Sequence, residues 1–309
     1  MDYQTLDYAE VSGMRFRPRR WPGALTGAGF LLLLLTMDIW LALRIAQRTP
    51  DLVSFLLGLM GLLTLPLLAA LGYGLYGLLN LTYDVNRNRV LIRWAASEQV
   101  IPLERITRIV EGSQLPDPVR WRGVKWPGYA IGRGEAEGWG PFLSFATEPL
   151  RHQLLLVTPS LSYFISPPDR DGFLAALEVR RQLGALESVV QEARHAPFLT
   201  WPLWRDRTLW WLALAGALAN GALFAYLCWR YTSLPLFLPL HFDPLGHADR
   251  IGTRAELFRL PLIGLLALLV NGVLGGVLHP RQRLAGYLLL GGALLVQVLL
   301  GMGLWALMS

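Results

Sequence analysis

The chain has 309 residues, of which 53% are hydrophobic and only 16% are charged, and its formal net charge is +6. Soluble domains carry about 25% charged residues, so this composition excludes an ordinary soluble protein, and juxtamembrane arginines explain the basic balance better than nucleic-acid binding does. The single cysteine, Cys228, excludes a disulfide within the chain and a thiolate metal cluster.

Two apolar runs near the N-terminus, Gly23–Leu43 and Leu52–Leu79, are each long enough to cross a bilayer as a helix. Four arginines lie just before the first run, at positions 15, 17, 19 and 20. By the positive-inside rule they predict that residues 1–22 are cytoplasmic and that residues 23–81 form a membrane hairpin. Glycines 72, 74 and 77 of the second run are expected to allow close contact between helices.

Residues 82–206 have the composition of a folded cytoplasmic domain. Short β-prone segments predict strands at Leu81–Val85, Arg89–Trp94, Gln99–Ile101, Ile106–Val110, Pro141–Thr147, Gln153–Thr158 and Tyr163–Ser166. The Pro-, Gly- and Trp-rich stretch Ser113–Gly140 is expected to be a long loop with one strand near Tyr129–Ile131. A helix is predicted over Asp169–Ala193, with Asp169 as its cap and an apolar stripe that includes Phe173, Leu174 and Leu177. The order of elements indicates a small β-barrel or sandwich capped by a C-terminal helix.

Three further apolar runs, Leu209–Trp229, Leu257–Leu278 and Leu284–Leu307, predict a three-helix membrane domain over residues 207–309. Residues 230–256 would then form an outer loop, and the tight turn with Arg281 and Arg283 would face the cytoplasm. The predicted fold class is a multi-pass α-helical membrane protein of five spans with an inserted cytoplasmic domain. We expect it in the bacterial inner membrane, with its N-terminus cytoplasmic and its C-terminus outside.

Three segments of the central domain carry a resemblance to a known family. They are 83–92 (Tyr-Asp-Val-Asn-Arg-Asn-Arg-Val-Leu-Ile), 101–106 (Ile-Pro-Leu-Glu-Arg-Ile) and 163–174, which ends in Ser-Pro-Pro-Asp-Arg-Asp-Gly-Phe-Leu. On these segments residues 81–195 resemble the bacterial pleckstrin-homology-like domains that lie beside membrane helices. The resemblance implies a seven-stranded barrel closed by a helix, and it implies no ligand.

A second resemblance rests on residues 238–250, Leu-Pro-Leu-His-Phe-Asp-Pro-Leu-Gly-His-Ala-Asp-Arg, followed by Leu-Pro-Leu-Ile at 260–263. With these segments, residues 209–307 resemble a membrane domain of unknown function shared with the SdpI-related toxin-immunity family. The resemblance implies a role in immunity, envelope stress or signalling, and it implies no chemical reaction.

The most motif-like residues lie in the outer loop, at His241, Asp243, Gly246, His247 and Asp249. Imidazoles and carboxylates in such a cluster can bind a metal, but the spacing matches no zinc signature. We expect these residues to order the loop against the fourth helix, with Asp249 bonded to backbone amides or to Arg250 or Arg254. No metal and no cofactor are predicted.

Polar side chains near the middle of the apolar runs, at Asn220, Asn271 and Gln297, need partners in hydrocarbon. We expect them to face one another or a neighbouring chain, and a transport path is the alternative. Asp38 is the one carboxylate inside an apolar run. It is expected to reach interface water or Arg44, and a proton-relay role stays open.

Aromatic and basic residues are interleaved in the stretch that is expected to be a loop, at Arg120, Trp121, Arg122, Lys125, Trp126, Arg133 and Trp139. Beside a bilayer such residues suit lipid headgroups or a partner protein, while packing within the domain explains them equally well. The sequence contains no catalytic signature.

The functional hypothesis is therefore a non-enzymatic membrane protein, either an interaction and sensing module or an accessory subunit of a membrane complex. Its expected partners are the lipid bilayer and other membrane proteins. The alternatives are a toxin-immunity or envelope-stress protein that recognises a ligand at the outer loop, and a small transporter.

Overall fold

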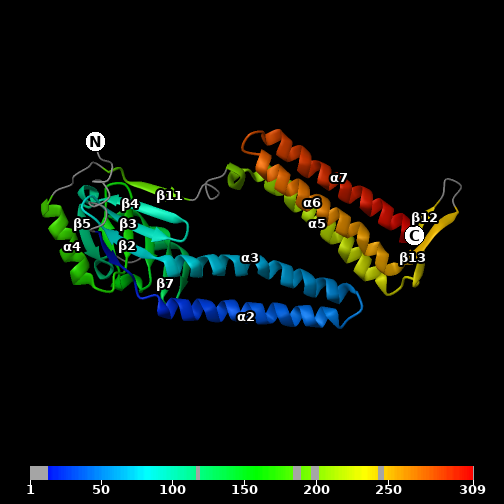
Figure 1. The fold of residues 1–309 in the computed structure, drawn as a ribbon, viewed down its shortest axis with the longest axis horizontal. Coiled ribbons are helices and arrows are strands. Elements are labelled where there is room, and N and C mark those ends of the chain that lie inside the picture. The colour runs from blue at the N-terminus through cyan, green and yellow to red at the C-terminus, as the bar shows by residue number, and fades with distance from the viewer. Residues whose placement is uncertain (1–12, 116–118, 184–188, 196–201, 243–246, 309) are drawn as a thin grey trace, which may run out of the picture. The chain divides into compact units, whose positions relative to one another are not determined.

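The structure is a computed structural model that describes residues 13–115, 119–183, 189–195, 202–242 and 247–308 (Figure 1). The chain forms two compact units. The first comprises Met1–Thr36 and Pro66–Ala196, and the second comprises Met37–Leu65 and Pro197–Ser309. Five helices in the described residues are long and apolar enough to cross a membrane.

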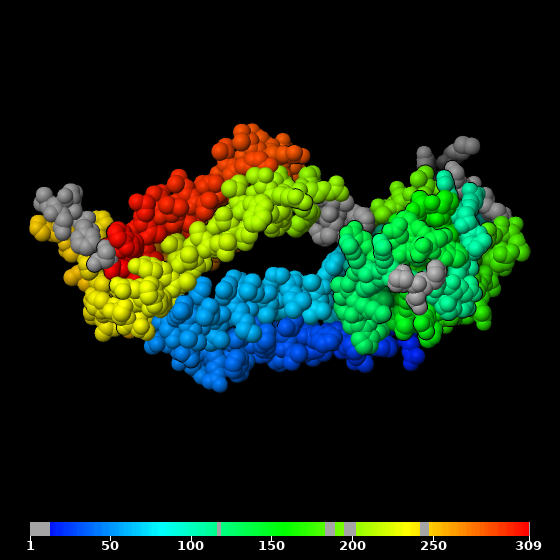
Figure 2. Space-filling view, turned by 180° about the vertical axis from the view of Figure 1, so that it is seen from behind, coloured from blue at the N-terminus to red at the C-terminus, as the bar shows by residue number. Residues whose placement is uncertain are grey.

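The first two of these helices are α2 (Trp21–Ala46) and α3 (Leu52–Asn80), which lie side by side in both views (Figures 1 and 2). Asp51 begins α3 as a cap, because its Oδ1 accepts a hydrogen bond of 2.7 Å from the amide of Ser54. The backbone amides of Ser54 lower the pKa of the Asp51 carboxyl, which keeps this cap ionised.

A β-rich domain follows α3 and is built from two sheets. The first sheet has the order β1 (Met14–Phe16), β2 (Thr82–Val85), β3 (Arg89–Trp94), β4 (Ser97–Pro102) and β11 (Glu192–His195). The second has the order β5 (Arg108–Glu111), β9 (Leu154–Val157), β10 (Ser162–Ile165), β8 (Gly140–Ala146), β7 (Tyr129–Ala136) and β6 (Arg120–Trp126). Among the described strands, no ladder joins the two sheets into one closed barrel.

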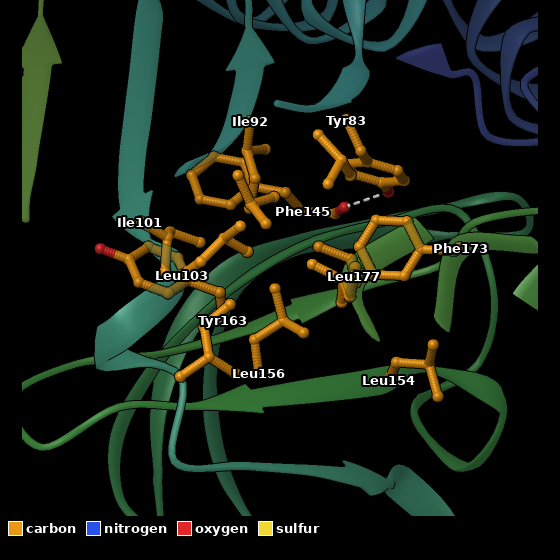
Figure 3. Close-up of a cluster of buried hydrophobic side chains, with 14 of the residues drawn as sticks. Tyr83, Ile92, Ile101, Leu103, Phe145, Leu154, Leu156, Tyr163, Phe173 and Leu177 are labelled. Carbon is orange, nitrogen blue, oxygen red and sulfur yellow. Dashed lines mark hydrogen bonds between the residues drawn. The ribbon is translucent and has the colours of Figure 1, made fainter. Parts of the chain in front are cut away.

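Large apolar side chains from both sheets and from helix α4 (Arg170–Leu183) form the core of this domain (Figure 3). Phe173 and Leu177 of α4 are 0% and 2% exposed and close the core from the helix side. Tyr83 is fully buried, and its hydroxyl donates a hydrogen bond of 2.6 Å to the Phe145 carbonyl across the two sheets. Burial raises the pKa of this hydroxyl, so it remains a donor.

Two sequence-based predictions of secondary structure in this domain were wrong. The stretch 113–140, expected to be a loop around one strand near Tyr129–Ile131, contains that strand as the start of the longer β7, together with a second strand, β6, that pairs with it. The helix expected over Asp169–Ala193 ends at Leu183, and Glu192–His195 instead pairs with β4 as strand β11. The partner of β11 is β4, which lies far away in the sequence, and glycines interrupt the strand pattern of β6 and β7. Local periodicity therefore does not reveal these strands.

Helices α5 (Arg207–Tyr231), α6 (Arg259–Leu278) and α7 (Arg283–Met308) form a three-helix bundle in the second unit. The space-filling view shows α5 and α7 in direct contact over most of their length (Figure 2). Gly275 of α6 and Gly286 of α7 lie against each other, and a side chain added at Gly286 would approach the Gly275 carbonyl to 3.2 Å. These small residues let the two helices approach closely near the turn that joins them.

The connection between α5 and α6, expected to be a loop, contains the antiparallel strands β12 (Phe237–Phe242) and β13 (Ala248–Thr253). A short 3-10 turn at Arg254–Phe258 then leads into α6. Thr253 and Glu256 form a capping box at the start of that turn, which fixes where the chain re-enters the bundle.

Candidate functional site

The predicted aromatic and basic residues lie on the β6–β7 hairpin, which a two-residue turn closes between Trp126 and Tyr129. The turn is Pro127–Gly128, and Gly128 has a φ of +80°, a conformation that favours glycine. β6 is the last strand in the order of its sheet, so one side of its backbone has no strand partner among the described residues.

Three arginines gather on one face of this hairpin. Arg122 lies directly opposite Arg133, and Arg120 lies opposite Glu135 one step along the same face. All three arginines line a surface hollow of about 370 Å³, together with Glu135 and several apolar residues. Within the described part of the chain, none of the three guanidinium groups forms an ion pair. Because like charges directly opposite each other destabilise a strand pair, this arrangement favours binding of an anionic group.

Trp126 is held by contacts within the chain. Its Nε1 donates a hydrogen bond of 2.9 Å to the carbonyl of Gly23 in α2, and its ring stacks on Tyr129 with centroids 3.8 Å apart. A side chain at Gly23 would lie 2.1 Å from the Gly128 carbonyl, so only glycine allows the turn to approach α2. This contact holds the hairpin against the first turn of α2.

Two glycines of α3 also lie against aromatic side chains of the β-rich domain. Gly74 faces the rings of Trp126 and Tyr129, and Gly77 faces Trp94 of β3. The sequence-based hypothesis that these glycines serve contact between helices therefore misses their aromatic neighbours from the β-rich domain. Gly72 has no neighbour within 4 Å of an added side chain.

The remaining members of the predicted set point elsewhere. Trp121 and Trp139 are half-buried against the smaller apolar cluster around Phe142 and Leu155. Lys125 is exposed and alternates to the other face of β6 from Arg122. The structure thus separates the predicted residues into a basic face, an attachment to α2 and α3, and ordinary packing. Arg133 completes the basic face, and its position directly opposite Arg122 depends on the strand register, which the sequence does not reveal.

Two of the three polar residues in the bundle meet. Asn220 of α5 donates a hydrogen bond of 3.0 Å from Nδ2 to Oε1 of Gln297 in α7, and Gln297 Nε2 donates 2.7 Å to the carbonyl of Gly264 in α6. Both side chains are buried, at 4% and 1% exposed. Asn271 instead bonds the Ala267 carbonyl of its own helix. The hydrogen bonds of Asn220 and Gln297 join α5, α6 and α7, so these two amides stabilise the packing of the helices.

Asp38 of α2 accepts hydrogen bonds of 2.7 and 2.9 Å on its two carboxylate oxygens from the Thr64 hydroxyl of α3. The expected pairing with Arg44 is not formed, because Arg44 lies over the Trp40 ring instead. The contact joins the two helices of the pair.

The outer-loop residues form part of the β12–β13 pair. His241 Nδ1 lies 2.7 Å from Asp249 Oδ1, and both side chains are about half exposed or more, at 66% and 48%. The expected bond from Asp249 to Arg250 or Arg254 is not formed: Arg250 pairs with Glu256, and Arg254 donates to the Tyr231 and Leu234 carbonyls. Asp243 and Gly246 lie outside the described residues, and His247 lies beside their gap.

No group of three or more metal-ligating side chains occurs in the described residues. The cap formed by Thr253 and Glu256 could have been predicted from the sequence, since the two residues have capping-box spacing before an apolar run. The expectation that the outer-loop residues order the loop and bind no metal stays a prediction.

Residues 81–181 match the family described as "Bacterial PH domain", which agrees with the two sheets and the closing helix α4. This confirms the pleckstrin-homology-like segment and defines a class of protein, one with a PH-like domain and five apolar helices of membrane-spanning length. The match covers about a third of the chain and does not extend to the resemblance of residues 209–307, which stays a prediction. Comparisons with curated proteins and with solved structures gave no match.

Proposed function

We propose that this chain is a non-enzymatic inner-membrane protein that acts as an interaction module or accessory subunit, and that the basic face of its PH-like domain binds an acidic segment of a partner membrane protein. The proposal places the five apolar helices across the membrane and the PH-like domain in the cytoplasm. The arginines before α2 and in the α6–α7 turn support this orientation.

The observation that carries the proposal is the pairing of Arg122 with Arg133 on an exposed hairpin. A surface pair of like charges beside Arg120 is destabilising unless an anionic partner offsets the repulsion, and Glu135, the one acidic residue that lines the hollow in the described part of the chain, forms no ion pair with these arginines. Charge complementarity of this kind steers association and selects the partner.

The backbone of β6 favours a protein partner over a lipid headgroup. β6 is an edge strand, and Arg122, Gly123, Val124 and Lys125 are exposed, with Val124 at 55%. An edge strand offers its unpaired amides and carbonyls to an extended segment, which adds as a further strand. A headgroup would use the charges alone. An extended acidic peptide uses the charges and the edge together.

Purification of the full chain from native membranes in mild detergent, followed by native mass spectrometry, tests this function. We expect a stoichiometric partner that is lost when Arg122→Glu and Arg133→Glu are combined. Arg122→Lys with Arg133→Lys keeps both charges and should retain it. Arg181→Glu is the matched control, because Arg181 is exposed on α4 of the same domain and does not line the hollow.

A partner that survives the double charge reversal would contradict the assignment of this face. A chain that purifies alone would contradict the accessory-subunit function. If deletion of that lone protein sensitised cells to a toxin, the immunity function would replace the one proposed.

A further inference from the structure

A separate basic pocket lies at one end of the three-helix bundle, where α5 and α7 begin and α6 ends. It has a volume of about 560 Å³ and is lined by Pro202, Arg205, Asp206, Arg207, His279, Arg283 and Tyr287. All of these residues belong to the second unit. No residue of the PH-like domain lines the pocket, so the pocket is separate from the basic face of that domain.

Three arginines line this pocket. Among the described residues, Arg205, Arg207 and Arg283 form no ion pair, and all three are exposed. Arg207 and Arg283 are also the first residues of α5 and α7. A helix start carries partial positive charge, so a cation there is unfavourable unless an anion is present. The first turn of α7 contains no acidic residue, whereas Asp206 caps α5.

The one carboxylate in the pocket is occupied by other bonds. Asp206 Oδ2 accepts a hydrogen bond of 2.6 Å from the Tyr287 hydroxyl, and Oδ1 accepts one of 3.2 Å from the amide of Leu209. The Tyr287 hydroxyl in particular lowers the pKa of the Asp206 carboxyl, so this group stays ionised as the cap of α5. It does not neutralise the arginines by direct contact.

His279 gives a second, independent sign of a ligand. It is 1% exposed, yet it lines the pocket, and neither of its ring nitrogens has a hydrogen-bond partner among the described residues. Its Nε2 lies 3.2 Å from Asp206 Oδ2 without forming a hydrogen bond. A buried ring N–H without an acceptor is costly, and a phosphate oxygen would accept a hydrogen bond from it.

We propose that this pocket binds the phosphate group of an anionic phospholipid, with Arg205, Arg207 and Arg283 as the residues that hold it. The inference rests on the membrane insertion proposed above, which would place the pocket at the cytoplasmic surface beside anionic headgroups. Guanidinium groups suit this ligand because they donate two parallel hydrogen bonds to phosphate oxygens. Basic pockets between helices at this surface are where acidic headgroups bind.

Native mass spectrometry of the full chain tests the site with phosphatidylglycerol and phosphatidylcholine as titrants in detergent. We expect one phosphatidylglycerol to bind with at least about tenfold preference over phosphatidylcholine. Arg207→Gln combined with Arg283→Gln should abolish that preference, and the corresponding Lys variants should retain most of it. Arg281→Gln is the matched control, because Arg281 lies in the same turn and outside the pocket.

Resistance of each variant to carbonate extraction separates the outcomes. An extraction-resistant double variant that still prefers phosphatidylglycerol would overturn the site. An Arg281→Gln variant that loses the lipid equally would also overturn it, by showing a general effect of charge. Tight binding of sodium phosphate without lipid preference would keep the phosphate chemistry and overturn the lipid as its source. Wild-type protein that carbonate extracts would contradict the membrane insertion itself.

Discussion

Phe173 and Leu174 are neighbours on α4, but only Phe173 contributes to the core. Phe173 is 0% exposed and its ring meets Phe16 edge to face, with centroids 5.2 Å apart, whereas Leu174 is 36% exposed. Leu177, one turn on, is 2% exposed. The apolar stripe of the sequence is therefore narrower than its residue types indicate.

Phe173→Ala and Leu177→Ala should each destabilise the PH-like domain by about 2–5 kcal/mol, because each leaves a cavity in a packed core. Leu174→Ala, the matched control, should change stability by less than about 0.5 kcal/mol. Urea titration of the full chain in mild detergent, followed by near-ultraviolet circular dichroism, measures all three. Equal losses at Phe173 and Leu174 would show that α4 does not pack as described.

A second residue-scale prediction concerns the amides of the bundle. Asn220→Leu should destabilise the three-helix bundle by about 0.5–2 kcal/mol, because it leaves Gln297 without its partner on α5. Asn271→Leu is the control, since Asn271 bonds only its own helix. Unfolding in increasing sodium dodecyl sulfate compares the two variants. A larger loss at Asn271 would contradict the internal role of the Asn220–Gln297 pair.

At the scale of elements, the contact between the β6–β7 turn and α2 depends on the absence of side chains. Gly23→Ala would force the Gly128 carbonyl away, since the new methyl group would lie 2.1 Å from it. We expect faster hydrogen exchange at Trp126 and Tyr129, with a cost of about 1–3 kcal/mol. Gly29→Ala is the control on the same helix, because nothing lies within 4 Å of its added carbon. Unchanged exchange in Gly23→Ala would mean that the turn does not rest on α2.

At the scale of the whole molecule, the number of spans sets which parts share a side of the membrane. With the N-terminus in the cytoplasm, five spans place residues 82–206 inside and both Arg48 and Asp249 outside. Single cysteines at positions 48, 104 and 249, in a Cys228→Ala background, can be labelled with a membrane-impermeant maleimide. Positions 48 and 249 should react in intact spheroplasts, and position 104 only after permeabilisation. Labelling of position 249 only after permeabilisation would contradict this topology.

The sequence by itself determined the five apolar helices and the PH-like segment. Both follow from local composition and from short motifs, such as the run at 83–92 and the entry to α4. The strands β6 and β11 could not be predicted, and only the first residues of β7 were, because the stability of these strands comes from partners across the sheet and not from periodicity within the segment.

Only the tertiary structure decided which candidate residues share a site. Trp126 and Arg122 lie within one short stretch, yet one attaches the domain to α2 and the other faces Arg133. Arg205 is far in sequence from His279 and Arg283, and it meets them in one pocket because α5, α6 and α7 place their ends together. Such convergence depends on helix packing and strand register, which long-range contacts set and which no single segment encodes.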